Sequence, residues 1–180
     1  MMRIIAGKYR HKLLTWPDDA DYIRPTKDRI RESIFSALGN INGTSVLDLY
    51  AGSGAMGIEA LSRGSTSATF VDNNQVSITT VNKNIKSVGV KEQTEVLKMN
   101  DFDALNSFIN NEQFDIVFLD PPYKEGRYDE LLNTLINNDI LTKNGIVVVE
   151  TDRNLSLQTQ PFKKIKEYHY GKINVYILWR

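Results

Sequence analysis

The stretch Leu47-Asp48-Leu49-Tyr50-Ala51-Gly52-Ser53-Gly54-Ala55-Met56-Gly57 decides the fold. Its last six residues match G-x-G-x-x-G, and the apolar run before them predicts a strand that leads into the glycines. Glycines let the backbone turn tightly and approach a ligand, and the helix expected to follow offers free backbone N–H groups. Asp72 lies 20 residues after Gly52, at the end of the next predicted strand, where a carboxylate accepts hydrogen bonds from ribose hydroxyls. The stretch therefore predicts a nucleoside-binding unit rather than a turn that merely joins a strand to a helix.

Strands and helices alternate on both sides of this stretch. The apolar patterns predict strands at Ser45–Tyr50, Ser67–Asp72, Thr94–Met99, Phe114–Asp120 and Gly145–Glu150. Helices are expected between them at Ala55–Arg63, Gln75–Ser87, Asp101–Asn110 and Arg127–Asn138. The chain then ends in an antiparallel hairpin, Phe162–Tyr170 and Ile173–Trp179. This order predicts an α/β protein with a mostly parallel central sheet and an antiparallel C-terminal hairpin.

The first 40 residues read as an extension of that α/β body. Residues 2–6 and 9–15 predict a small hairpin, and Pro25 and Thr26 open a helix that Gly39 ends. We therefore expect an extension at 1–40 and an α/β domain at 41–180, packed as one compact unit.

The composition excludes several classes of protein. The chain has 180 residues, a formal net charge of zero and 41% apolar residues, as one globular domain typically does. It has no cysteine and only two histidines, so neither thiolate chemistry nor a metal site is expected. No apolar run approaches the roughly 18 residues that cross a bilayer. We expect a cytoplasmic monomer that binds no metal and no membrane.

Asp48 bears on the choice of nucleoside ligand. A carboxylate beside the glycines would repel the pyrophosphate of NAD but would attract an ammonium or sulfonium group. S-adenosylmethionine carries both cations and no phosphate. The alternative for Asp48 is that its carboxylate only caps the backbone N–H groups of the loop.

A second motif follows a later strand at the edge where ligands bind. Asp120-Pro121-Pro122-Tyr123 comes directly after the apolar run 116–119. Two prolines fix φ, so the carboxylate, the Pro121 carbonyl and the tyrosine ring are held in set positions. Two acceptors and an aromatic plane suit the exocyclic amino group of a planar base. A simple proline turn is the alternative.

These motifs together resemble one family of enzymes. The residues that carry the resemblance are Arg3 to Gly7, Arg24-Pro25-Thr26 with Asp28 to Glu32, Asp48 to Gly64, Asp72, Asp120 to Tyr123 and the hairpin around Gly171. The chain resembles the RsmD family of class I S-adenosylmethionine-dependent methyltransferases, which methylate N2 of a guanine in bacterial 16S ribosomal RNA. The resemblance implies a Rossmann-like fold.

The resemblance also implies roles for single residues. Asp120, Pro121, Pro122 and Tyr123 would form the site for the base amine. Gly52, Ser53 and Gly54 would lie against the methionine part of the cofactor, with Asp48 near its amino group and Tyr50 on the same surface. Asp72 would hold the ribose, and either Asn100 or Asp101 would read the adenine.

The N-terminal extension is the expected RNA surface. Residues 1–31 hold eight basic and four acidic side chains, whereas the remainder holds 14 basic and 18 acidic ones. Lys27 and Arg31 lie one helical turn apart and are expected to face outward together. The candidate RNA contacts are Arg3, Lys8, Arg10, Lys12, Arg24, Lys27, Arg29 and Arg31; a merely solvated helix is the alternative. The expected partner is 16S rRNA in an assembling small ribosomal subunit.

Three other functions remain open at this point. The chain could methylate another amine, such as adenine N6 of a nucleic acid or a protein glutamine. It could bind cofactor and RNA without catalysis. An NAD-dependent oxidoreductase fits least, because of Asp48 and the proline motif.

Overall fold

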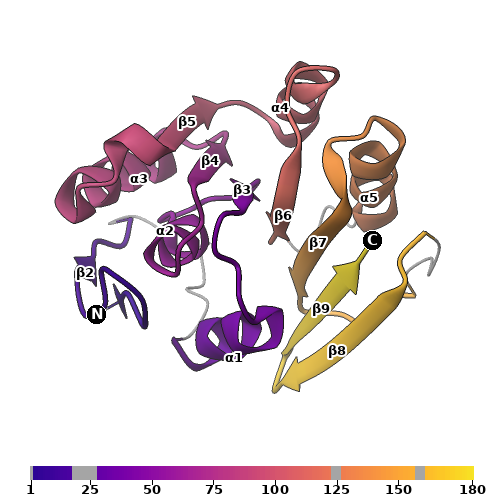
Figure 1. Cartoon of the computed structure of the whole chain (residues 1–180), viewed down its shortest axis with the longest axis horizontal. Helices are drawn as coiled ribbons and strands as arrows, with labels where there is room; N and C mark the ends of the chain where they lie inside the picture. The colour runs from indigo at the N-terminus through magenta and orange to yellow at the C-terminus, as the bar shows by residue number, and fades with distance from the viewer. Residues whose placement is uncertain (1, 18–27, 123–126, 157–160) are drawn as a thin grey trace.

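The computed structural model describes residues 2–17, 28–122, 127–156 and 161–180. A seven-stranded sheet runs through its centre with helices on both faces (Figure 1). The large sheet has the order β5-β4-β3-β6-β7-β9-β8, and a separate two-stranded sheet pairs β1 with β2. Strands β3 to β7 are parallel, whereas β9 pairs antiparallel with both β7 and β8. The predicted α/β fold with a mostly parallel sheet and an antiparallel C-terminal hairpin is thus confirmed.

The elements follow the predicted order with small shifts at their ends. The strands are β1 (Met2–Arg3), β2 (Leu13–Leu14), β3 (Ser45–Asp48), β4 (Ser67–Asp72), β5 (Thr94–Lys98), β6 (Phe114–Leu119), β7 (Leu141–Thr151), β8 (Lys164–Tyr170) and β9 (Ile173–Trp179). The helices are α1 (Asp28–Leu38), α2 (Ala55–Ser62), α3 (Gln75–Val88), α4 (Asp101–Phe108) and α5 (Tyr128–Asn137), with a 3-10 turn η1 (Lys91–Gln93). The described helices include none with the length and apolar character that crossing a membrane requires.

Side chains alternate between two hydrophobic cores along each central strand. On β6, Ile116 and Phe118 face the core shared with α1, α2 and α3, whereas Val117 and Leu119 face the core shared with α4 and α5. This period of two is the geometry of a strand covered on both faces. It explains why β6 and β7 read as continuous apolar runs.

The N-terminal hairpin is shorter than predicted because its loop is diverted onto α2. Only two residues pair on each strand, and the Lys8 N–H donates to the Ser62 carbonyl at 2.7 Å. The N–H groups of Ile5 and Ala6 donate to the Glu59 carboxylate, at 2.8 and 3.1 Å. Met2, Ile4 and Leu14 also belong to the core of α1 and α2. The extension and the α/β body therefore share one core.

Strand order changes direction at the centre of the sheet. The chain runs outward from β3 through β4 to β5, and then returns to place β6 on the other side of β3. At such a switch point the loops after two neighbouring strands diverge and leave a crevice beyond their carboxyl ends, where ligands bind in open α/β sheets. The ends of β3 and β6 carry Asp48 and Asp120.

Candidate active site

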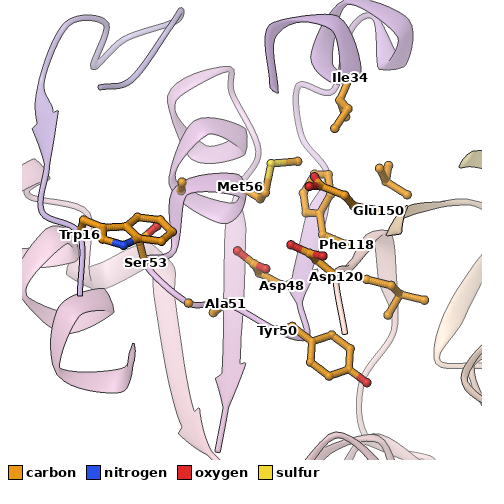
Figure 2. Close-up of a pocket in the computed structure, with 14 residues that line it drawn as sticks. Trp16, Ile34, Asp48, Tyr50, Ala51, Ser53, Met56, Phe118, Asp120 and Glu150 are labelled. Carbon is orange, nitrogen blue, oxygen red and sulfur yellow. The ribbon is translucent and has the colours of Figure 1, made fainter. Parts of the chain in front are cut away.

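A pocket lies at this switch point, bounded by the ends of β3, β6 and β7 (Figure 2). Its apolar wall includes Trp16, Ile34, Met56, Phe118, Leu119 and Val148. Its polar part includes Asp48, Tyr50, Gly52, Ser53, Asp120 and Glu150. Five of these six polar positions, all but Glu150, are predicted site residues. The fold thus joins the glycine loop and the start of the proline motif in one cavity.

The glycine loop, residues 49–54, turns sharply into α2. Gly54 is the N-cap of α2 with φ of 78°, a left-handed conformation that favours glycine. A Cβ on Gly57 would come within 2.4 Å of the Phe70 ring, so only glycine lets α2 pack this closely on β4. The local sequence therefore places the start of α2 directly above the sheet.

The Asp48 carboxylate caps this helix start. Its Oδ2 accepts the Gly57 N–H at 3.1 Å, which is the capping role left open by the sequence. The side chain is only 4% exposed and also lines the pocket. Burial, with a smaller effect of Asp72, raises the pKa of Asp48 to about 7.

Asp72 is held beside the glycine loop but does not line the pocket. Its Oδ2 accepts the Gly52 N–H at 2.9 Å and its Oδ1 accepts the Asn74 N–H at 2.8 Å. Both bonds orient the carboxylate at the end of β4. Gly54 likewise lies beside the pocket rather than on its wall.

The two candidate adenine-binding residues differ in their surroundings. Asp101 is almost buried and accepts hydrogen bonds from the Tyr50 hydroxyl at 2.6 Å and from Arg127 at 3.1 Å. Asn100 is exposed. Its side-chain oxygen accepts a hydrogen bond from the Asn73 amide at 3.3 Å, and its side-chain nitrogen donates to the Asp103 carboxylate at 3.4 Å. Neither lines the pocket.

Three carboxylates converge in the pocket from three neighbouring strands. Asp48, Asp120 and Glu150 share the sheet face of Val46, Phe118 and Val148, since each lies two residues beyond one of them. Figure 2 shows the three side chains directed into the same space. We call these three residues the carboxylate cluster. Among the lining residues that the structure describes there is no lysine, arginine or histidine.

The pKa of Asp120 reflects these neighbours. Burial raises it well above the usual range for a carboxyl, and the charges of Glu150 and then Asp48 raise it further.

The rest of the proline motif is described in part: Pro121 is buried and Pro122 is exposed, while Tyr123 lies outside the described residues. Across the described ranges, no group of three or more His, Asp or Glu side chains is arranged to hold a metal ion.

Sequence reasoning missed Glu150 and one wall of the pocket. The signal for Glu150 was present: in a parallel sheet the residue after Val149 on β7 lies level with the one after Leu119 on β6. Trp16 had no such signal. It reaches the glycine loop because Asn84 of α3 bonds both segments, donating to the carbonyls of Thr15 at 2.9 Å and Ser53 at 2.8 Å.

The predicted RNA contacts divide into three groups. Arg3, Lys8, Arg10, Lys12 and Arg29 are exposed. The ammonium groups of Lys8 and Lys12 both lie over the Tyr9 ring, at 5.3 and 5.4 Å from its centroid. Arg24 and Lys27 lie outside the described residues. Arg31 forms the third group by itself.

The prediction that Arg31 faces outward is wrong. Its side chain is 0% exposed, donates to the Arg3 carbonyl at 2.5 Å and to Asp28 at 3.1 Å, and lies 3.7 Å from Glu59. The reason is helical geometry, because Arg31 stands three, four and seven residues before Ile34, Phe35 and Leu38, all buried. Arg31 therefore fastens α1 to the hairpin and α2.

Comparison with known proteins identifies the family. The family model described as "Conserved hypothetical protein 95" matches residues 2–179. Over 160 residues the chain is 35% identical to the Haemophilus influenzae "Ribosomal RNA small subunit methyltransferase D", covering 88% of this chain and 82% of that protein. The chain belongs to the RsmD family.

Solved structures share the fold of this chain. A Thermus structure described as a hypothetical protein is 26% identical, has a TM-score of 0.82 and is matched over 98% of each chain. At 17% identity, an RNA methyltransferase from Salinibacter ruber in complex with S-adenosyl-L-homocysteine has the same fold, with a TM-score of 0.67 over 87% of this chain and 93% of that one. The resemblance inferred from the motifs is confirmed.

Proposed function

We propose that this RsmD-family protein transfers a methyl group from S-adenosylmethionine to the N2 amine of a guanine in 16S rRNA. The observation that carries the proposal is the pocket at the switch point, where Asp120 meets the glycine loop after β3. The name of the Haemophilus relative supports a small-subunit rRNA substrate.

The residues present fit the cofactor. The buried carboxyl groups of Asp48 and Asp120 both line the pocket, and a cationic ligand suits them because a positive charge favours their ionised form. Asp48, Gly52 and Ser53 would hold the methionine part, Asp72 the ribose, and Asn100 or Asp101 the adenine. When bound, S-adenosylmethionine supplies an electrophilic methyl group on its sulfonium.

Asp120 and the Pro121 carbonyl hold the reacting amine. Guanine N2 is a poor nucleophile because its lone pair is delocalised into the ring. Hydrogen bonds from its two N–H groups to Asp120 and to the Pro121 carbonyl favour a pyramidal nitrogen with its lone pair directed at the methyl carbon. The carboxylate stabilises the positive charge that develops on this nitrogen.

Asp120 then accepts the surplus proton. The nitrogen–carbon bond forms as the carbon–sulfur bond breaks, which leaves one proton too many on the amine. The raised pKa of Asp120 makes its ionised carboxylate a stronger base than an ordinary aspartate carboxylate. Tyr123, which ends the proline motif, would stack on the base.

The exposed cations of the N-terminal hairpin support an RNA substrate. Lys8, Arg10 and Lys12 lie together on that hairpin, and contacts to phosphates position a nucleic acid without reading its sequence. We also propose that the substrate is 16S rRNA within an assembling small subunit. The protein would act in the cytoplasm as a monomer.

One labelling experiment tests the proposal. The protein is incubated with methyl-labelled S-adenosylmethionine and small ribosomal subunits from cells that lack this activity, and the RNA is digested for mass spectrometry. Labelled N2-methylguanosine at a single site is the expected product. N6-methyladenosine instead, or unlabelled RNA with bound cofactor, would overturn the guanine assignment.

A further inference from the structure

A second hollow lies between α1 and β8, the strand at one edge of the large sheet (Figure 1). Its volume of about 540 Å³ lies within the usual range of ligand sites, so it has room for a nucleotide. The residues that line it include Arg29, Glu32, Ser33 and Ser36 of α1 with Tyr168 and Tyr170 of β8. We call this hollow the tyrosine groove. The mechanism above gives it no role.

The two tyrosines give the groove its aromatic planes. Their rings are nearly parallel, at 15°, and their centroids are 6.5 Å apart. Both side chains are half-buried, because they pack against the core of α1 and α2 and still line the groove. Bases of any identity stack on such rings, since every base has a flat π face. The hydroxyls of Ser33 and Ser36 offer hydrogen bonds to the edge of a stacked base.

Two lysines continue the tyrosines along the same face of β8. Lys164, Lys166, Tyr168 and Tyr170 are spaced two residues apart, which places them on one face of the strand. The ammonium groups of the two lysines lie over the ring of Trp179 on β9, 4.8 and 6.0 Å from its centroid. At roughly 3.4 Å per residue the four side chains span about 20 Å. Cations in line with aromatic rings suit the phosphates and bases of a single strand of nucleic acid.

The charge of the C-terminal hairpin also favours a polyanion. Residues 161–180 hold five basic side chains and one acidic one, whereas residues 32–160 hold nine basic and 17 acidic ones. Lysines on an edge strand also prevent pairing with other chains. That role explains the lysines but not two aromatic rings that line a groove.

The tyrosine groove and the carboxylate cluster lie on the same side of the sheet. Tyr168 pairs with Val175 of β9, Val175 pairs with Glu150 of β7, and Glu150 lies level with Asp120. Neighbouring strands lie roughly 4.8 Å apart, so the three steps from Asp120 to Tyr168 cover about 14 Å. An extended RNA strand crosses this distance in a few nucleotides. A base in the groove would therefore belong to the same RNA segment as a base at Asp120.

We propose that the tyrosine groove binds an unpaired nucleotide of the substrate RNA close to the methylated guanine. Its base stacks on Tyr168 and Tyr170, while the neighbouring phosphates contact Lys164 and Lys166. Arg29, one of the predicted RNA contacts, lies on the α1 side of the same groove. This inference rests on the proposed methylation of rRNA, and it adds the C-terminal hairpin to the RNA surface of the N-terminal one.

The first test separates the aromatic rings from their hydroxyls. Y168L/Y170L keeps apolar bulk against the core but removes the π faces, whereas the matched control Y168F/Y170F keeps the rings. The substrate is the small ribosomal subunit from cells that lack this methylation. The KM of Y168L/Y170L for subunits should rise roughly tenfold, because stacking is lost. Its kcat and its affinity for S-adenosylmethionine should stay close to those of the wild type, since the groove holds RNA away from the reacting atoms. Y168F/Y170F should behave as the wild type.

The second test removes a cation from the same face of β8. K166A should weaken RNA binding and should reduce the slope of log affinity against log salt concentration by about 0.7, as expected for one contact to a single-stranded phosphate. The matched control is K91A, an exposed lysine on η1, next to β5 at the opposite edge of the sheet. Its slope should equal that of the wild type.

A photo-crosslinker at the groove identifies the partner directly. Tyr168→p-benzoylphenylalanine should crosslink to rRNA at nucleotides close to the methylated guanine. Crosslinks to a ribosomal protein alone would overturn the inference. So would an unchanged KM in folded Y168L/Y170L, or in Y170L if the double variant does not fold. A merely structural role for the tyrosines would lower the melting temperature and kcat and leave KM as it is. Failure of the proposed function looks different, because the wild type would then methylate no RNA.

Discussion

Two groups of charged side chains, each with buried members, lie on the same side of the sheet and differ in the signs of the charges they bring together. The first, which we call the arginine network, joins Arg31 and Arg63 to Glu59 and Asp28. It lies between the first turn of α1 and the C-terminal end of α2. Glu59 is 1% exposed and lies 2.8 Å from Arg63 and 3.7 Å from Arg31. The second is the carboxylate cluster, which holds like charges and no cation among the described lining residues.

The difference separates a structural site from a ligand site. The opposite charges of the arginine network lie within ion-pair distance of one another and fasten the N-terminal extension to α2. Like charges held together in a buried space destabilise the folded protein and persist where function requires them. Residues of the first group should therefore affect stability, and those of the second should affect activity.

The largest expected effect is on activity, from D120A. Removing the carboxylate that orients the amine and accepts its proton should lower kcat roughly 10³-fold. Cofactor affinity, measured by calorimetry, should stay close to that of the wild type. D129N, on the exposed side of α5, is the matched control. If D120A turned over normally, the mechanism would be wrong.

The next effect is on stability, from E59A. The substitution leaves Arg31 buried with Asp28 as its remaining carboxylate partner in the network and removes the acceptor of the Ile5 and Ala6 N–H groups. Breaking a buried pair in this way should lower the free energy of unfolding by about 3 kcal/mol, measured by urea denaturation. E130A, an exposed change on α5, should stay within about 0.5 kcal/mol of the wild type. An E59A protein as stable as this control would show that the arginine network is not structural.

A smaller effect concerns pH and Asp48. Its pKa is about 7 in the folded protein and near 3.8 in the unfolded chain, so the folded state binds the extra proton between these values. The free energy of unfolding should therefore fall as pH rises from about 4 to 7, by at most about 1.4 kcal/mol per pH unit for this group. D48N keeps an oxygen for the Gly57 N–H and should flatten this slope in denaturation curves. The same slope in both proteins would mean that Asp48 is not desolvated.

The smallest effect is expected at the exposed N-terminal cations, from K8A/R10A. Each cation that neutralises a phosphate contributes about 0.7 to 0.9 to the slope of log affinity against log salt concentration, so loss of both should reduce the slope by about 1.4 to 1.8. RNA binding measured between low and moderate salt should therefore weaken and become less salt-dependent, while the melting temperature stays near that of the wild type. An unchanged salt slope would place the RNA surface elsewhere.

Local patterns predicted most of the fold for identifiable reasons. Each pattern that predicted the fold depends on neighbouring residues: the glycine loop, the apolar strands, and the change from a period of two to helical periodicity. For example, β4 was predicted at its observed ends, Ser67–Asp72. The N-terminal strands were predicted too long, because contacts with Glu59 and Ser62, more than 50 residues away, redirect the hairpin.

By itself, the sequence determined the α/β order, the glycine loop and the proline motif after β6, since these are properties of short segments. Only the tertiary structure decided which charges are buried, because burial depends on what a side chain packs against. Arg31 is buried because α1 packs on α2, where it lies beside Glu59. Glu150 lies level with Asp120 because β7 pairs in register with β6. Trp16 lines the pocket because Asn84 bonds its neighbour Thr15 and the glycine loop, and this contact joins segments far apart in the sequence.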